Sequence, residues 1–211
     1  MPTNWIDIRA FDARAVRYSV EIVRRVTAAD LDRPTPCSDW NLAELLAHMT
    51  AQHRGFAAAA AGDGGDPTKW EVRPVGPGEA SSAIAIGEYA IAADLVIDAF
   101  AQVGTPEQQF VLPEFTEGPS FPADRSMGFH FIDYVVHGWD VARALGIPFE
   151  PDPELLPAAL PVALAVPGGE RRLEPGAAFR PELPDPAAEP VPATTLDRIL
   201  GTLGRSPRWP A

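Results

Sequence analysis

Apolar side chains recur at helical spacing in four long segments, which are separated by shorter segments rich in Gly and Pro. The first predicted helix covers residues 12–27, and its start extends back to Asn4 in the widest interpretation. Its apolar face is made of valines spaced by four, three and three residues: Val16, Val20, Val23 and Val26. This spacing is typical of an amphipathic helix that buries one face.

The second and third predicted helices follow the same pattern. The second covers residues 41–61, where Asn41 is a suitable N-cap and Glu44, three residues later, completes a capping box. The glycine-rich segment 62–67 ends this helix. The third covers residues 78–103, a long segment rich in Ala.

The fourth predicted helix covers roughly residues 126–145. It follows short extended pieces in residues 105–125 and stops at Gly146. Beyond it the composition changes, because residues 148–211 hold more than half of the chain's 24 prolines. In this part we expect a short final helix at residues 194–203.

Proline limits the structure expected in the C-terminal part. Pro157 and Pro161 are expected to kink or break any helix there. Residues 168–192 read as a loop that includes a small hairpin. The order of elements predicts a mainly α protein in two parts, with a four-helix bundle in residues 1–147 and a proline-rich extension in residues 148–211.

Charge and composition exclude several classes of function. With 29 acidic against 17 basic residues, the formal net charge is −12, which argues against binding to nucleic acid or to an anionic membrane. No apolar run reaches the ~18–20 residues of a membrane helix. The N-terminal residues lack the basic start and apolar block of a signal peptide. We therefore expect a soluble cytoplasmic protein.

The fourth predicted helix carries a line of polar residues in the sequence HFIDYVVHGWD. At 100° per residue, His130, Asp133 and His137 fall within about 60° of one another, and Asp140 lies beside Asp133. Two interpretations are open. In the first, which the spacing alone favours, the line faces water. In the second, Asp133 and His137 hold one divalent metal ion from adjacent turns, as nitrogen and oxygen ligands hold Zn²⁺.

A metal site on this helix needs a third ligand from another element. The remaining histidines are His48, His53 and His130, and the first two lie on the second predicted helix. The apolar face of that helix directs His53 inward and leaves His48 on its flank, so periodicity does not choose between them. A lone histidine near an apolar face is more often a satisfied core residue than a ligand.

Two motifs resemble a known family. The segments PTPCSDWNLAELLAHM at residues 34–49 and VVHGWDVARALG at residues 135–146 are similar to the mycothiol-dependent maleylpyruvate isomerase N-terminal family, within the DinB-like metalloprotein superfamily. The ending at residues 194–207 resembles a subgroup known only as metal-binding proteins. The resemblance spans most of the chain and implies a DinB-like four-helix bundle with a divalent metal ion between its helices.

The resemblance also implies a set of ligands. His48 stands at the end of the LLxH motif, and Asp133 with His137 matches a D/E-x-x-x-H motif. His53 and His130 match no ligand of the family. Three protein ligands leave a position for water or substrate, which is the form of a catalytic site.

The implied chemistry is that of a metal-bound thiol. The expected ion is Zn²⁺ and the thiol of the family is mycothiol, whose thiolate adds to an electrophilic substrate in an isomerase or transferase reaction. Two alternatives stay open: a metal-dependent hydrolase, and a metalloprotein whose ion only joins two helices. The family often pairs through its bundle, so a homodimer is expected.

Two features limit what the resemblance implies. Residues 148–211 do not resemble the C-terminal domain of the isomerase, so the isomerase reaction does not follow from the motifs. The single cysteine, Cys37, excludes an intrachain disulfide. It is interpreted either as a redox-active thiol near the metal or as a small buried residue, and the second is more usual.

Overall fold

The computed structural model describes two compact units, Met1–Phe149 and Glu150–Ala211. The described residues are 5–37, 40–115, 120–174, 178–184 and 193–210. Each unit is considered separately below.

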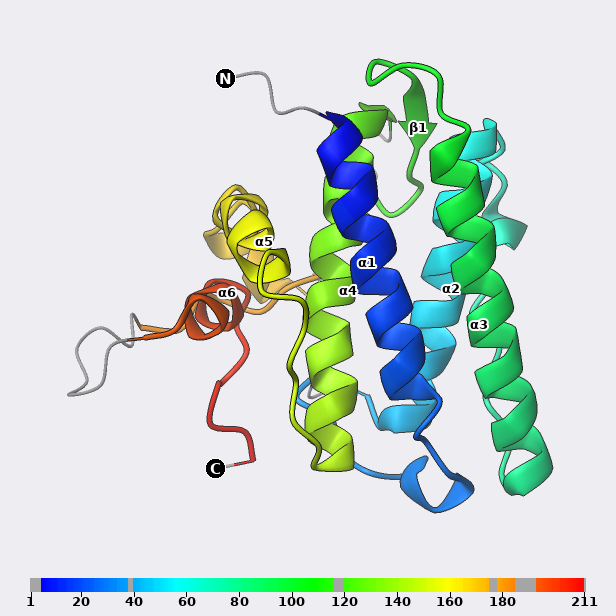
Figure 1. The fold of residues 1–211 in the computed structure, drawn as a ribbon, viewed down its shortest axis with the longest axis vertical. Helices are drawn as coiled ribbons and strands as arrows, with labels where there is room; N and C mark the ends of the chain where they lie inside the picture. The colour runs from blue at the N-terminus through cyan, green and yellow to red at the C-terminus, as the bar shows by residue number, and fades with distance from the viewer. Residues whose placement is uncertain (1–4, 38–39, 116–119, 175–177, 185–192, 211) are drawn as a thin grey trace. The chain divides into compact units, whose positions relative to one another are not determined.

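Four long helices form the first unit, as Figure 1 shows. They are α1 (Trp5–Val23), α2 (Leu42–Ala61), α3 (Glu79–Ala101) and α4 (Ala123–Leu145). Helix α1 packs against α4 and α3, and α2 packs against α3 and α4. The prediction of a mainly α protein with a four-helix bundle is confirmed.

The colour gradient of Figure 1 shows that α2 and α3 run in the same direction, while α1 and α4 run in the opposite one. Residues 62–78 therefore return along the bundle, as a crossover, between the two parallel helices. This crossover contains the short 3₁₀ helix η2 (Pro67–Trp70), which packs on α2. The Trp70 indole donates to the carbonyl of Gly64 at 2.8 Å and helps to hold the segment in place.

The ends of α2 and α4 follow the sequence signals. The Asn41 side chain accepts from the backbone N–H of Glu44, and the Glu44 carboxylate accepts from that of Asn41, each at 2.9 Å. Gly62 and Gly146 end the two helices at φ values of 93° and 70°, in the left-handed region where glycine is the least strained residue.

The first helix begins at Trp5, near the earliest predicted start, and ends before the predicted residue 27, at Val23. The backbone then tightens, since the Arg25 and Val26 N–H groups bond to carbonyls three residues back. Thr27 and Asp30 form a capping box for the next short helix, η1 (Ala28–Asp30). Local capping therefore ends the helix before the valine pattern ends, and Val26 is still buried although it lies beyond α1.

A two-stranded antiparallel sheet joins α3 to α4. Its strands are β1 (Gln109–Val111) and β2 (Ser120–Pro122), with Phe110 opposite Phe121. The short extended pieces predicted in residues 105–125 are therefore present. Phe110 is fully buried and extends the aromatic core of the bundle.

The second unit contains α5 (Leu155–Leu164), the 3₁₀ helix η3 (Glu170–Leu173) and α6 (Thr195–Thr202), and α5 packs against α6. The final helix was predicted, and Thr194 caps it. From the sequence, Pro157 and Pro161 are expected to kink or break a helix here; the break is not observed, because α5 runs through both. Pro157 lies in the first turn, where no intrahelical N–H bond is lost. The predicted hairpin is not found among the described residues of 168–192.

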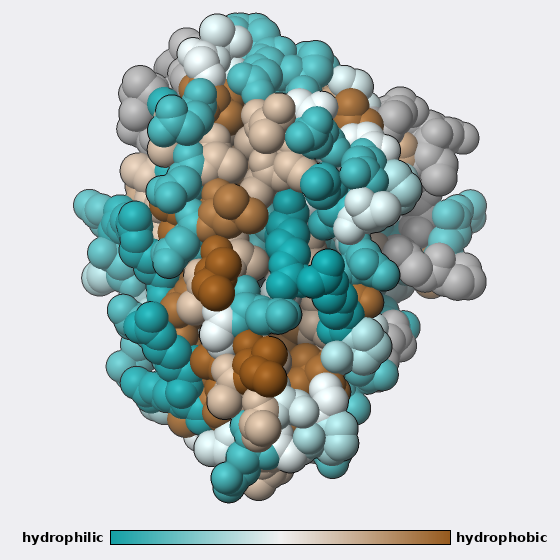
Figure 2. All heavy atoms as spheres, turned by 90° about the vertical axis from the view of Figure 1, so that its right-hand side faces the viewer, coloured by the Kyte–Doolittle hydropathy of each residue, from teal (hydrophilic) through white to brown (hydrophobic). Residues whose placement is uncertain are grey.

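An apolar line runs along the exposed face of α3. Figure 2 shows apolar side chains gathered on the face that α3 forms. Three large side chains of α3 are exposed there: Ile84, Ile91 and Leu95. Within the described part of the chain, no helix combines the length and apolar content that crossing a membrane requires.

Candidate metal centre

Three potential ligands converge from α2 and α4. His48, Asp133 and His137 each offer a nitrogen or oxygen atom, and these three atoms all lie within 4.8 Å of one another. His48 comes from the middle of α2, and the other two come from adjacent turns of α4. Helical spacing of four residues puts Asp133 and His137 on the same side of α4.

A buried carboxylate fixes the orientation of the His137 ring. The Nδ1 atom of His137 lies 2.9 Å from Oδ2 of Asp140, and Asp140 is fully buried. A carboxylate accepts from an N–H group, so this contact places the proton of the neutral ring on Nδ1. The Nε2 lone pair of His137 is then free to bind a metal ion, as in carboxylate–histidine–metal arrangements.

The distance between the His137 and Asp133 side chains fits two ligands of one cation. Nε2 of His137 lies 3.3 Å from Oδ1 of Asp133. With Nδ1 as the donor to Asp140, both of these atoms present lone pairs, so their proximity is unfavourable unless a positive charge lies between them. Two ligands that each lie ~2.0–2.1 Å from a tetrahedral or octahedral ion are themselves about 2.9–3.4 Å apart. The donor set therefore fits a divalent transition metal.

The third candidate ligand, His48, is kept neutral by its surroundings. Burial, reinforced by the nearby His137, lowers the pKa of His48 to about 4, although the charge of Asp133 acts in the opposite direction. The Trp40 ring lies 4.4 Å from the His48 ring and 6.2 Å from the His137 ring, centroid to centroid. The neutral imidazole is the form that binds a metal ion.

The interpretation that the polar line of α4 faces water is wrong. His130 and Asp140 are fully buried, His137 is 3% exposed, and only Asp133 is partly exposed. The line faces the interior of the bundle because polar partners from α1 and α2 meet it there. The spacing of residues along α4 carries no information about these partners, because they lie on other helices.

His53 and His130 belong to a different buried cluster. Nδ1 of His130 lies 2.7 Å from Oδ1 of Asp12, and Nε2 of His130 lies 3.1 Å from Nδ1 of His53. All three side chains are essentially inaccessible to solvent. They join α1, α4 and α2, and they are not part of the set of three candidate ligands.

Tyr134 connects this cluster to the candidate ligands. Its ring stacks on His53, with a centroid distance of 3.9 Å, and its hydroxyl donates to the carbonyl of Met49. Tyr134 follows Asp133 and Met49 follows His48 in the sequence. The hydrogen bond thus ties together the two backbone segments that carry the ligands.

Sequence reasoning missed Asp12 and Tyr134, and it interpreted Trp40 as a packing residue and not as a neighbour of the site. For Asp12 a signal existed, because it lies four residues before Val16 and therefore on the apolar face of α1. For Tyr134 and Trp40 no pattern distinguished a packing residue from a neighbour of the site.

Two further residues lie at or near the margin of the site. Cys37 is half-buried and is not in the set of candidate ligands; its carbonyl accepts from the N–H of Trp40. Glu114 is exposed as a whole residue, but burial of its carboxyl group, and secondly the negative charge of Asp133, raise the pKa of that group to about 7. At the centre itself, the carboxyl group of Asp133 is a candidate ligand and that of Asp140 contacts His137, an arrangement that suits a cation.

Comparison with known proteins identifies related sequences. Residues 13–142 match the Mycothiol maleylpyruvate isomerase N-terminal domain family. The uncharacterized proteins MT0763 and Rv0738, from two strains of Mycobacterium tuberculosis, are each 30% identical over 193 residues, which is 92% of this chain and 93% of the relative.

Solved structures show the same fold. The crystal structure of a mycothiol-dependent maleylpyruvate isomerase superposes with a TM-score of 0.52 and 13% identity, over 75% of this chain and 68% of that one. A histidine-to-alanine mutant of such an isomerase gives 0.58 and 12%, over 91% and 81%. An alignment over 91% of 211 residues extends beyond the bundle into the second unit.

Proposed function

This chain belongs to the Mycothiol maleylpyruvate isomerase N-terminal domain family, and from that membership we propose that it holds a divalent metal ion, Zn²⁺ being the expected one, for the chemistry of a small-molecule thiol. The ligands in this proposal are His48, Asp133 and His137. The reaction is a transfer or isomerisation in which mycothiol, or a thiol like it, attacks an electrophilic substrate.

One observation carries the proposal: three neutral or anionic donor atoms from two helices meet within 4.8 Å of one another. A set of three leaves room in the coordination sphere, which a closed structural site with four protein ligands does not. When bound, an ion of this kind lowers the pKa of a coordinated thiol and so keeps it as a thiolate near neutral pH.

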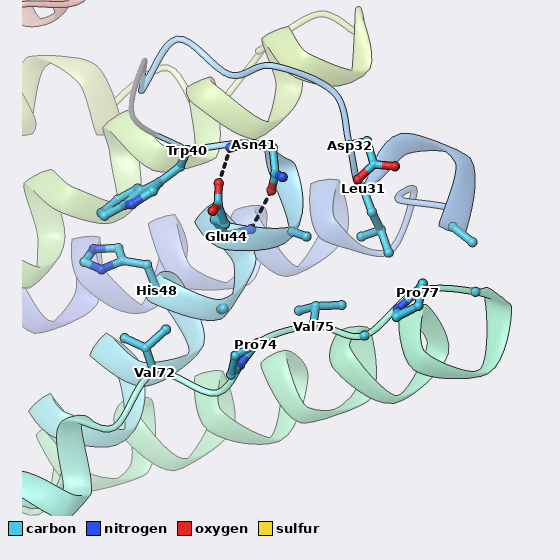
Figure 3. Close-up of a pocket in the computed structure, with 15 residues that line it drawn as sticks. Leu31, Asp32, Trp40, Asn41, Glu44, His48, Val72, Pro74, Val75 and Pro77 are labelled. Carbon is cyan, nitrogen blue, oxygen red and sulfur yellow. Dashed lines mark hydrogen bonds between the residues drawn. The ribbon is translucent and has the colours of Figure 1, made fainter.

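The residues of the chain prepare the site for such a ligand. Asp140 holds the proton of His137 on Nδ1 and leaves Nε2 unprotonated. Burial keeps His48 neutral, and Asp133 supplies a negative charge. The Trp40 ring packs against the His48 ring, with the ring centroids 4.4 Å apart (Figure 3).

The experiment that tests the proposal is a thiol titration. Protein loaded with Co²⁺ is titrated with mycothiol, and the sulfur-to-metal charge-transfer absorption is recorded. We expect a saturable absorption that is absent from a His48→Ala, His137→Ala double variant. Saturable metal binding without any thiolate absorption would contradict the thiol chemistry while leaving the metal site intact.

The two alternatives give different results in the same sample. A metal-dependent hydrolase would hydrolyse esters or amides without added thiol. An ion with only a structural role would leave no exchangeable position, so neither a thiol nor a hydrolysable substrate would alter the cobalt spectrum.

A further inference from the structure

The candidate metal centre spans the boundary between two pairs of helices, which we call the seam. Helix α4 packs mainly against α1, and α2 packs mainly against α3, as Figure 1 also shows. His48 belongs to the pair α2/α3, whereas Asp133 and His137 belong to the pair α1/α4. The ligands of one ion must be placed to within a few tenths of an ångström. The site therefore depends on the contacts that hold α2 to α4 across the seam.

A hydrogen bond crosses the seam at the level of the ligands. The Tyr134 hydroxyl of α4 donates to the backbone carbonyl of Met49 of α2. Tyr134 directly follows Asp133, and Met49 directly follows His48, so each bonded residue has its Cα atom ~3.8 Å from that of a candidate ligand. The bond therefore acts on the same two helical turns that carry the ligands.

The Tyr134 ring is held in place by a buried polar cluster. It is 1% exposed and stacks on the His53 ring of α2, with 3.9 Å between the centroids and 11° between the planes. Nδ1 of His53 lies 3.1 Å from Nε2 of His130, whose Nδ1 lies 2.7 Å from Oδ1 of Asp12 on α1. Close packing of this kind leaves the ring little freedom to move away from the bond that it makes.

From these contacts we propose that the Tyr134–Met49 bond is a clamp, which holds α2 and α4 at the spacing that the candidate ligands need to bind one ion. Tyr134 is then a positioning residue. It is outside the candidate ligands, but it strengthens metal binding because the metal-free protein already holds its ligands together. The inference rests on the proposed function, since it requires the divalent ion. Loss of the clamp is expected to weaken metal binding about threefold to tenfold.

The chain offers a matched control in Tyr89. This residue is also 1% exposed, and its hydroxyl lies 2.6 Å from Oγ of Ser19, across the same seam. The contact joins α3 to α1, and neither of these helices supplies any of the three candidate ligands. Phenylalanine at position 89 or 134 removes one buried hydroxyl and keeps the ring. The two variants therefore differ in which helices they release.

The first test compares Zn²⁺ binding by the full-length wild type, Tyr134→Phe and Tyr89→Phe, in competition with a coloured chelator. We expect Tyr134→Phe to bind Zn²⁺ about threefold to tenfold more weakly and Tyr89→Phe to bind as the wild type does. Urea denaturation of the metal-free proteins should give similar decreases in midpoint for the two variants. Wild-type affinity in Tyr134→Phe would overturn the inference. An equal loss of affinity in Tyr89→Phe would also overturn it, because a general weakening of the core would explain both.

A second measurement uses the wild type alone. Coupling between two binding events is reciprocal, so an ion that binds better when the clamp is formed must also strengthen the clamp. Zn²⁺ is therefore expected to slow the exchange of the Tyr134 hydroxyl proton with water and to leave that of Tyr89 unchanged. NMR of protein with labelled tyrosine follows both protons. No slowing at Tyr134, or equal slowing at Tyr89, would overturn the inference.

Failure of the clamp and failure of the proposed function give different results. Zn²⁺ binding that does not depend on Tyr134 would contradict the clamp alone. Metal binding without the cobalt–thiolate absorption would contradict the thiol chemistry alone. A wild type that binds no Zn²⁺ would overturn both the metal site and the clamp.

Discussion

At the scale of single residues, Asp140 controls the site without belonging to the candidate ligands. Its carboxylate accepts from Nδ1 of His137, and it is fully buried beside that ring. An orienting carboxylate of this kind makes the histidine a better ligand and fixes its tautomer.

Replacing Asp140 with Asn is therefore expected to weaken metal binding by about 10–100-fold, because the neutral amide holds the His137 proton less firmly. The measurement is competition for Zn²⁺ with a coloured chelator. Asp124→Asn, an exposed acid at the start of the same helix, is the matched control and should bind as the wild type does. Equal affinity of the Asp140→Asn variant would mean that Asp140 has only a packing role.

His53 gives a pH dependence of stability that does not involve the metal. Burial, with a smaller effect of His130, places the pKa of His53 well below its ordinary value of 6.5, so the folded protein keeps this ring neutral. As the pH falls below 6.5, the unfolded chain binds a proton that the folded protein does not. The free energy of unfolding then decreases by up to about 1.4 kcal/mol per pH unit from this group.

The variant that tests this is His53→Phe, which retains a ring against Tyr134 and cannot titrate. Chemical denaturation of metal-free protein between about pH 6.5 and 5 should give a shallower slope for the variant than for the wild type. An identical slope would contradict the assignment of a low pKa to His53.

At the scale of elements, the crossover depends on one glycine of α2. A Cβ atom at Gly55 would lie 2.1 Å from the Trp70 ring, far closer than packing allows. Trp70 anchors η2, and residues that follow it line a pocket that also includes His48.

Gly55→Ala is expected to displace Trp70 and to destabilise the protein by about 1–3 kcal/mol. The metal content should stay unchanged, since Gly55 lies seven residues, about two helical turns, beyond His48 on α2. Denaturation and metal analysis measure the two properties. Gly87→Ala, at an exposed position of α3 with open space around it, is the control and should cause no loss of stability.

The elements that could be predicted from the sequence are those with local signals. The capping box at Asn41 and Glu44 marked the start of α2 and Gly146 marked the end of α4, because each signal acts within one turn of helix. The interior position of the polar line on α4 could not be predicted, since it depends on Asp12 and His53 from other helices. The resemblance selected His48 over His53, and the structure brings His48 together with Asp133 and His137.

At the scale of the whole molecule, the expected homodimer stays a prediction. The exposed apolar line of α3, with Ile84, Ile91 and Leu95, is the surface at which we test for pairing of two chains. Light scattering measures the molecular mass of the wild type and of the Ile91→Glu variant in solution. A dimeric mass for the wild type and a smaller mass for the variant are expected, and a wild-type monomer would contradict pairing.

The most direct test of the central claim is the metal content of the purified full chain. The claim predicts about one divalent ion per chain in the wild type and in His53→Phe, whose histidine lies outside the candidate ligands. It predicts almost none in the His48→Ala, His137→Ala variant, provided that circular dichroism shows the helices intact. A folded double variant that retains the metal content of the wild type would contradict the account.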